Sequence, residues 1–125
     1  MVKKHSPRFL AIVEAARSEI GECEAPELRA MLDDGAPLVV IDVRERHEFE
    51  AGHLAGAVHI GKGVIERDIE KQELADDVRI VLYCGGGFRS AIAAKSLQDM
   101  GWTNVSSLWG GWRGIQAEGL PIWTP

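Results

Sequence analysis

The sequence changes character at Leu82-Tyr83-Cys84-Gly85-Gly86-Gly87-Phe88-Arg89-Ser90. An apolar run, 80–83, ends in a cysteine, three glycines follow, and a run of good helix formers begins at Ser90. This order predicts a strand, a tight loop and a helix. Backbone N–H groups of such a loop can converge on one point, and their positive partial charge lowers the pKa of a nearby thiol. The segment therefore predicts that Cys84 is a nucleophile; the alternative is a buried cysteine that ends a strand.

Strands and helices alternate on both sides of this segment. A second continuous apolar run, 38–41, predicts another strand that is buried on both faces. The clearest helix is 90–100, and Ser90 is expected to cap it with its hydroxyl. The other expected elements are helices at 8–20, 26–33, 45–51, 64–74 and 112–118 and strands at 57–60 and 105–108. The pattern predicts an α/β fold, with a mostly parallel sheet between layers of helices.

Two of the strands end in residues that could carry chemistry. Cys84 follows the strand at 80–83, and Arg44 follows the strand at 38–41. In open parallel sheets, ligands bind beyond the carboxyl ends of the strands. We therefore expect Cys84 and Arg44 to border one crevice.

The composition narrows the classes of function. The chain has 125 residues, 46% of them hydrophobic, and a net charge of −5. It has no basic block, so a nucleic acid partner is not expected. No apolar run could span a bilayer and no signal peptide is recognisable, so we expect a cytoplasmic protein that does not associate with membranes. The two cysteines, Cys23 and Cys84, are not in a Cys-x-x-Cys pair and no histidines cluster with them, so neither a structural disulfide nor a metal site is expected.

The N-terminal helix stands apart from the rest of the pattern. Gly21 is the candidate boundary between an extension, residues 1–20, and a single domain, residues 21–125. Ser6 is expected to cap the helix and Pro7 fits its first position. The helix carries enough apolar residues to need a covering surface, either on its own domain or on a second copy of the chain.

Three motifs occur in order along the chain. They are Ile41-Asp42-Val43-Arg44-Glu45 with Glu48-Phe49 and Gly52-His53-Leu54-Ala55-Gly56-Ala57, then the loop from Cys84 to Ser90, and then Leu108-Trp109-Gly110-Gly111-Trp112. Together they resemble the N-terminal signature, the six-residue active-site loop and the Leu-x-Gly-Gly segment of the single-domain rhodanese (sulfurtransferase) family. The resemblance covers about residues 22–121, and residues 1–20 lie outside it.

The resemblance implies a fold and a chemistry. The fold is a five-stranded parallel sheet flanked by helices, here with an extra N-terminal helix. In the implied chemistry, Cys84 takes a sulfane sulfur from a small donor, thiosulfate or a persulfide, and passes it to a thiophilic acceptor such as cyanide, a thiol or another protein. No cofactor is expected. The implied substrate-binding groups belong to the loop residues Gly85, Gly86, Gly87, Phe88 and Arg89.

The arginines near the loop do not identify the sulfur donor. Arg89 either attracts an anionic donor or pairs with an acidic neighbour and holds the loop in shape. Arg44 is the signature residue most suited to reach the pocket, as a further substrate-binding group. Because the loop glycines bring no charge and the whole chain is acidic, the sequence does not favour thiosulfate over a persulfide donor.

Two other functions compete with sulfur transfer. Related phosphatases and arsenate reductases place arginine six positions after the cysteine, whereas Arg89 is five positions after Cys84. The other alternative is a non-catalytic sulfur-carrier or regulatory module, and the presence of Cys84 argues against this class. The physiological donor and acceptor, the choice between monomer and homodimer, and the roles of Cys23 and of residues 1–20 stay open.

Overall fold

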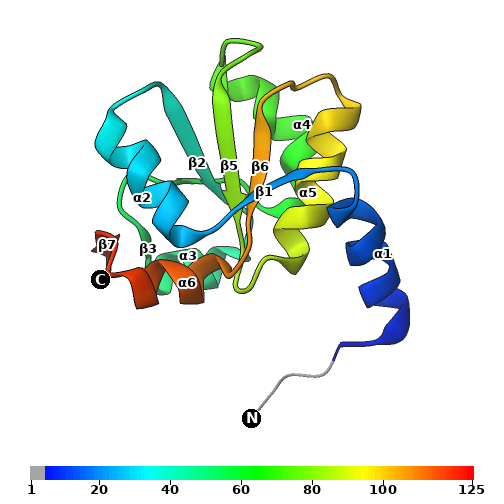
Figure 1. Cartoon of the computed structure of the whole chain (residues 1–125), viewed down its shortest axis with the longest axis horizontal. Coiled ribbons are helices and arrows are strands. Elements are labelled where there is room, and N and C mark those ends of the chain that lie inside the picture. Colours follow the sequence, from blue (N-terminus) through cyan, green and yellow to red (C-terminus); the bar gives the residue numbers. More distant parts are fainter. Residues whose placement is uncertain (1–4) are drawn as a thin grey trace.

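A five-stranded parallel sheet forms the centre of the computed structural model, which describes residues 5–125 (Figure 1). Every neighbouring pair of strands is parallel, which confirms the predicted fold class. In spatial order the strands are β1 (Gly21–Cys23), β6 (Val105–Leu108), β5 (Arg79–Tyr83), β2 (Leu38–Asp42) and β4 (Val58–His59).

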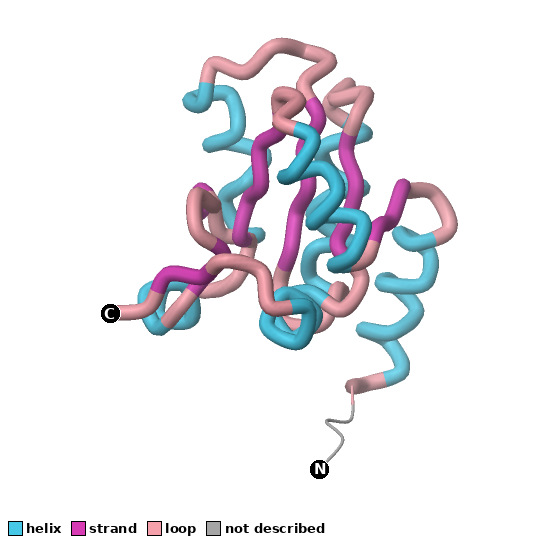
Figure 2. Tube along the Cα trace, turned by 60° about the vertical axis from the view of Figure 1, so that its left-hand side comes forward, coloured by secondary structure: helices cyan, strands magenta, loops and turns pink. Residues whose placement is uncertain are grey.

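Helices cover both faces of this sheet (Figures 1 and 2). On one face α2 packs against α6, and on the other α5 contacts α4 and α1. The helices are α1 (Pro7–Arg17), α2 (Ala25–Asp34), α3 (Arg46–Ala51), α4 (Ile65–Asp68), α5 (Phe88–Asp99) and α6 (Gly111–Glu118), with short 3₁₀ segments η1 (Lys62–Val64) and η2 (Ile69–Gln72). Among the described residues, no helix has the length and apolar character needed to cross a bilayer.

Strand β5 shows why its sequence is continuously apolar. Ile80 and Leu82 belong to the core under α5, while Val81 and Tyr83 belong to the core under α2 and α6. All four side chains are fully buried. A strand with helices on both faces has no side that faces solvent, so its sequence does not alternate between apolar and polar residues.

Helix α5 begins earlier than predicted. Its N-cap is Gly87, whose φ of 115° lies in the left-handed region, and its first residue is Phe88. The prediction that Ser90 caps this helix is therefore wrong. Because the glycine turns the chain directly into the helix, Ser90 lies in the first turn with its side chain fully buried.

The remaining elements agree with the sequence in part. Ser6 caps α1 through a 3.2 Å hydrogen bond from the Phe9 N–H, as predicted. The single helix expected at 64–74 is instead α4 flanked by η1 and η2, since only Ile65 and Ile69 of these short segments are buried. A small antiparallel sheet of β3 (His53–Leu54) and β7 (Ile122–Trp123) was not expected, because two-residue strands carry no periodicity.

Candidate active site

Cys84 lies at the carboxyl end of β5, on the floor of a cleft of about 800 Å³. The cleft is lined by the Cys84 loop and by residues of α1, α3 and α6. Arg44, which follows β2, also lines it. The structure thus brings Cys84 and Arg44 to one crevice at the carboxyl edge of the sheet, the place where ligands bind in folds of this class.

The Cys84 sulfur is buried but surrounded by hydrogen-bond donors. The residue is only 1% exposed, the Gly87 N–H donates to Sγ at 3.1 Å, and the Ser90 hydroxyl lies 3.5 Å from it. Burial is the largest single influence on the pKa of Cys84 and raises it, but hydrogen bonding from Ser90, Gly87 and Gly86 more than offsets burial. The net effect lowers the pKa of Cys84 below the ordinary cysteine value, which favours the thiolate.

The hydroxyl of Ser90 is held toward the sulfur by a second buried serine. Ser107 of β6 lies 2.8 Å from Ser90, oxygen to oxygen, and both side chains are fully buried. A hydroxyl has one donor hydrogen and accepts through its lone pairs, so Ser107 can donate to Ser90 while Ser90 donates to the sulfur. Sequence reasoning missed this contact, because Ser107 lies on another strand.

The loop backbone is fixed from the side by α6. The Trp112 N–H donates to the Cys84 carbonyl at 2.7 Å, and the Gly110 N–H donates to the Gly86 carbonyl at 3.0 Å. This approach requires glycine at position 111, where φ is 49° and a Cβ atom would collide with the Cys84 carbonyl oxygen. The Leu-Trp-Gly-Gly-Trp motif therefore shapes the loop on which the thiol lies.

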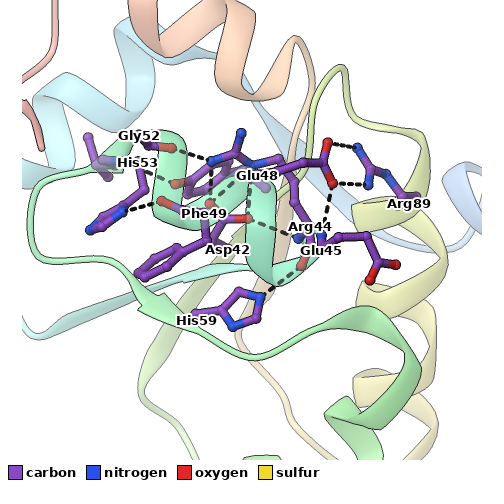
Figure 3. Close-up of polar contacts among 11 residues, drawn as sticks. Asp42, Arg44, Glu45, Glu48, Phe49, Gly52, His53, His59 and Arg89 are labelled. Atoms are coloured by element: carbon purple, nitrogen blue, oxygen red, sulfur yellow. Dashed lines mark hydrogen bonds and ion pairs between the residues drawn. The ribbon is translucent and has the colours of Figure 1, made fainter. Parts of the chain in front are cut away.

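Arg89 is turned toward α3 and forms a two-pronged ion pair with Glu48 (Figure 3). The two nitrogen–oxygen distances are 2.8 and 3.3 Å. The hydrogen bond from Arg89 is the main reason why the pKa of Glu48 is lowered to about 2. Glu48 also accepts from the Glu45 backbone N–H and so anchors the start of α3. Arg89 thus has an acidic partner, as one alternative predicted, but its guanidinium also lines the cleft and interacts with the Cys84 thiolate.

Arg44 is also paired, more deeply in the fold. Its guanidinium donates to both carboxylate oxygens of Asp42 and to the Gly52 carbonyl at 2.7 Å (Figure 3). The side chain is 5% exposed and lies over the Trp112 ring. The first motif therefore forms a buried ionic cluster that joins β2 to α3 and borders the cleft.

Aromatic rings form another wall of the cleft. Phe88 of the loop contacts His5 at 4.7 Å and Trp109 at 5.6 Å between ring centroids, and Phe9 of α1 lies 6.3 Å from it. His5 and Phe9 also line the cleft. The N-terminal extension thus contributes to the site, and no local sequence signal indicated that it would.

Arg113 is a further cleft residue that the sequence did not indicate. It directly follows the third motif and lies in the first turn of α6. Its guanidinium is so close to Gly86 that a Cβ atom at that position would displace it. Proximity to the Gly110-Gly111 turn was the one signal available in the sequence.

Cys23 lies outside the cleft that contains Cys84. It is 3% exposed at the end of β1, and burial raises its pKa to about 11. It lines a separate cleft of about 350 Å³ beside Trp109. Within residues 5–125, no group of three or more His, Cys, Asp or Glu side chains is placed to hold a metal ion.

Comparison with known proteins places most of the chain in one domain type. The family model for the rhodanese-like domain matches residues 24–118. The tRNA uridine(34) hydroxylases of Cronobacter sakazakii and Enterobacter sp. are 33% and 32% identical to the chain, each over 114 residues and 84% of this chain. The chain spans about a third of their length, 32% in each case.

Solved structures agree with this match. A Rhodopseudomonas palustris protein of unknown function, a possible tyrosine phosphatase, is 29% identical, with a TM-score of 0.82 over 98% of this chain and 99% of that one. The polysulfide-sulfur transferase homodimer of Wolinella succinogenes is 27% identical, with a TM-score of 0.78 over 93% and 87%. A Pseudomonas aeruginosa thiosulfate sulfurtransferase shares the fold at 24% identity, with a TM-score of 0.82 over 94% of this chain and 22% of that one.

Proposed function

The chain belongs to the rhodanese-like domain family, and from this premise we propose that it is a sulfurtransferase whose Cys84 carries the transferred sulfur. The observation that carries the proposal is the hydrogen bonding of Cys84 Sγ by Gly87 and Ser90 at the floor of an open cleft. These donors favour an anionic sulfur, and the thiolate is the nucleophile in sulfur chemistry.

The first half-reaction loads the cysteine. The Cys84 thiolate attacks the sulfane sulfur of the donor, a new S–S bond forms, and the bond to the donor's leaving group breaks. With thiosulfate, the leaving group departs as sulfite with the bonding electron pair, and charge is conserved because the persulfide is itself an anion. The loop N–H groups that favour the thiolate also favour the outer persulfide sulfur.

The second half-reaction unloads it. A thiophilic acceptor attacks the outer sulfur, and Cys84 leaves as the thiolate, ready for another donor. With cyanide as acceptor the product is thiocyanate. Neither half-reaction changes the number of electrons in the system, so the proposed cycle needs no cofactor or metal. We expect a monomer or a homodimer that uses a small donor and either a small acceptor or a protein acceptor.

Phosphate chemistry fits the site less well. The similarity to a possible tyrosine phosphatase makes phosphatase activity an alternative function to consider. In phosphatases on this fold an arginine six positions after the cysteine clamps the phosphate, but Arg89 is five positions after Cys84 and its guanidinium is bonded to Glu48. We therefore expect no hydrolysis of an aryl phosphate that depends on Cys84, and no reduction of arsenate.

A second candidate function is favoured by sequence identity to the tRNA uridine(34) hydroxylases. In this alternative the chain acts in the modification of uridine 34 of tRNA. Its net charge of −5 provides no electrostatic attraction for the tRNA backbone. Nucleoside mass spectrometry of tRNA from cells lacking the gene tests it. Loss of hydroxylated uridine 34, restored by the wild type but not by Cys84→Ser, would support the hydroxylation role.

The sulfurtransferase proposal is tested by intact-protein mass spectrometry after incubation with thiosulfate or glutathione persulfide. We expect the wild type to gain the mass of one sulfur atom and to lose it on addition of cyanide. Cys84→Ser should gain nothing, and the matched control Cys23→Ala should behave as the wild type. A folded wild-type protein that gains no sulfur from either donor would refute the proposal and favour a regulatory module.

A further inference from the structure

Three arginines line the cleft that contains Cys84, and two of them are neutralised. Arg44 donates to the Asp42 carboxylate at 2.7 Å, and Arg89 donates to the Glu48 carboxylate at 2.8 Å. The field of an ion pair falls off much faster with distance than the field of a lone charge. The carboxylates therefore compensate much of the charge that these two residues present to an approaching anion, although the Arg89 guanidinium also interacts with the Cys84 thiolate.

Arg113 differs from both. Among residues 5–125, no carboxylate lies within ion-pair distance of its guanidinium, and the residue is exposed. It is nevertheless held near the loop, because its backbone N–H donates to the Gly85 carbonyl at 3.3 Å and its guanidinium lies against Gly86. A positive charge without a carboxylate partner among the described residues is thus placed beside Gly86, in the cleft that also contains Cys84.

The absence of a side chain at Gly86 fits this placement. A Cβ atom there would meet the Arg113 guanidinium, so glycine leaves the loop surface open to the cation. The charge of the whole chain, −5, works against the approach of an anion. A cation among the residues that line the cleft offsets that repulsion, and guanidinium binds the oxygens of anionic groups in a two-pronged geometry.

We propose that Arg113 is the specificity-determining residue for the donor and that it binds the donor's anionic group while Cys84 attacks the sulfane sulfur. The substrate class is a small anion that carries a sulfane sulfur: the anionic group is the sulfonate end of thiosulfate or a carboxylate of a low-molecular-weight persulfide. The inference rests on the proposed function for its substrate, but its electrostatic core can be tested without sulfur transfer.

The first test compares two alkylating agents of similar size, anionic iodoacetate and neutral iodoacetamide. In a Cys23→Ala background only Cys84 can react. We expect Arg113→Gln to lower the rate with iodoacetate by about two- to fivefold at low salt, as for an exposed charge pair, and to leave the iodoacetamide rate unchanged. Arg113→Lys should retain most of the preference, and high salt should abolish the difference.

The matched control is Arg79→Gln. Arg79 is also exposed and unpaired among the described residues, but it lies at the amino end of β5, roughly 15 Å of strand away from Cys84. The Arg79→Gln substitution removes the same charge as Arg113→Gln. The ratio of the iodoacetate rate to the iodoacetamide rate should therefore stay at the wild-type value. Equal changes in Arg113→Gln and Arg79→Gln, or a parallel fall with both reagents in Arg113→Gln, would overturn the inference.

The second test measures persulfide formation with thiosulfate and with glutathione persulfide. We expect Arg113→Gln to raise the KM for anionic donors with little change in kcat. An effect confined to one donor identifies that donor's anionic group as the ligand. If the wild type forms persulfide and Arg113→Gln forms it with equal efficiency from both donors, this inference fails while the sulfurtransferase stands. If no persulfide forms but the iodoacetate preference depends on Arg113, the anion site stands while the sulfurtransferase fails.

Discussion

The reactivity of Cys84 is decided by a balance of opposing effects on one atom. Burial alone would make this thiol harder to ionise than an exposed cysteine, as burial does for Cys23. The difference between the two cysteines is the set of donors: Cys84 receives hydrogen bonds from the loop and from Ser90, and burial strengthens bonds to an anion. The same fold therefore raises the pKa of one buried thiol and lowers the pKa of the other.

Ser90→Ala should make Cys84 less reactive. Loss of a hydrogen bond to the thiolate raises the pKa of Cys84, so the midpoint of a rate-against-pH curve moves to higher pH. A hydrogen bond to a charged group is worth about 1.5–3 kcal/mol, so the midpoint should rise by roughly one to two pH units. Alkylation rates between pH 5 and 10 measure the shift.

Ser96→Ala provides the control for this prediction, because Ser96 lies two turns further along α5 and has no contact with the sulfur. Its curve should coincide with that of the wild type. An unchanged midpoint in Ser90→Ala would show that the loop N–H groups alone set the reactivity of Cys84.

The Glu48–Arg89 pair should make stability depend on acidity. The pKa of Glu48 is about 2 in the folded protein, below the ordinary carboxyl value of about 4.3 expected in the unfolded chain. The pair's contribution is therefore complete above the unfolded value and is lost as the pH falls toward 2. Denaturant titrations from pH 7 to 2 should show a decline that Glu48→Gln reduces. Equal declines in both proteins would contradict the assignment.

At the scale of elements, two helices meet the loop with their N-termini. Helix α5 grows directly out of the loop after Gly87, and α6 begins at Gly111 against the Cys84 and Gly85 backbone. The positive end of a helix dipole favours a nearby anion by about 0.3–1 kcal/mol when exposed. The sheet thus positions the thiol, the start of α5 brings the donors Gly87 and Ser90 to the sulfur, and α6 holds the loop backbone.

Gly111→Ala should disrupt the site through the contact between α6 and the loop. The new methyl group meets the Cys84 carbonyl oxygen, and φ at this position is 49°. Gly35 also has a positive φ, 71°, but open space around it, so Gly35→Ala isolates the conformational cost of about 1–2 kcal/mol. Denaturant unfolding should show a larger loss for Gly111→Ala, with a fall in Cys84 alkylation that Gly35→Ala does not share.

At the scale of the whole molecule, the N-terminal helix is packed onto its own chain. Helix α1 lies against α5, its Arg17 side chain covers the Trp109 ring at 3.6 Å, and its first turn adds Phe9 to the cleft (Figure 1). The extension is thus continuous with the fold, although the family match begins only at residue 24.

Two neighbouring residues of α1 test how much this packing contributes. Val13 is fully buried, whereas Ile12 is 58% exposed. Val13→Ala should lower the free energy of unfolding by roughly 1–2 kcal/mol, since about 0.8 kcal/mol is lost per buried methylene-sized group. Ile12→Ala should change it by less than about 0.5 kcal/mol. Equal effects of the two changes would mean that α1 is not docked in solution.

Local features of the sequence predicted the fold class, which the structure confirms, and identified Cys84 as the candidate nucleophile. The continuous apolar runs at 38–41 and 80–83 predicted strands covered on both faces, and the glycines after Cys84 predicted the loop. These properties depend on neighbours in the chain, so they are visible without coordinates. The same local reasoning erred at Ser90, because a glycine cap moved the start of α5 by two residues.

Only the tertiary structure decided which charges and rings surround that cysteine. It paired Arg89 with Glu48, left Arg113 unpaired at the cleft among the residues it describes, set Ser107 behind Ser90, and brought His5 to Phe88. Each of these contacts joins segments far apart in the chain. Their geometry depends on the order of the strands and on the packing of the helices. Neither produces a recognisable pattern of apolar and polar residues in the sequence.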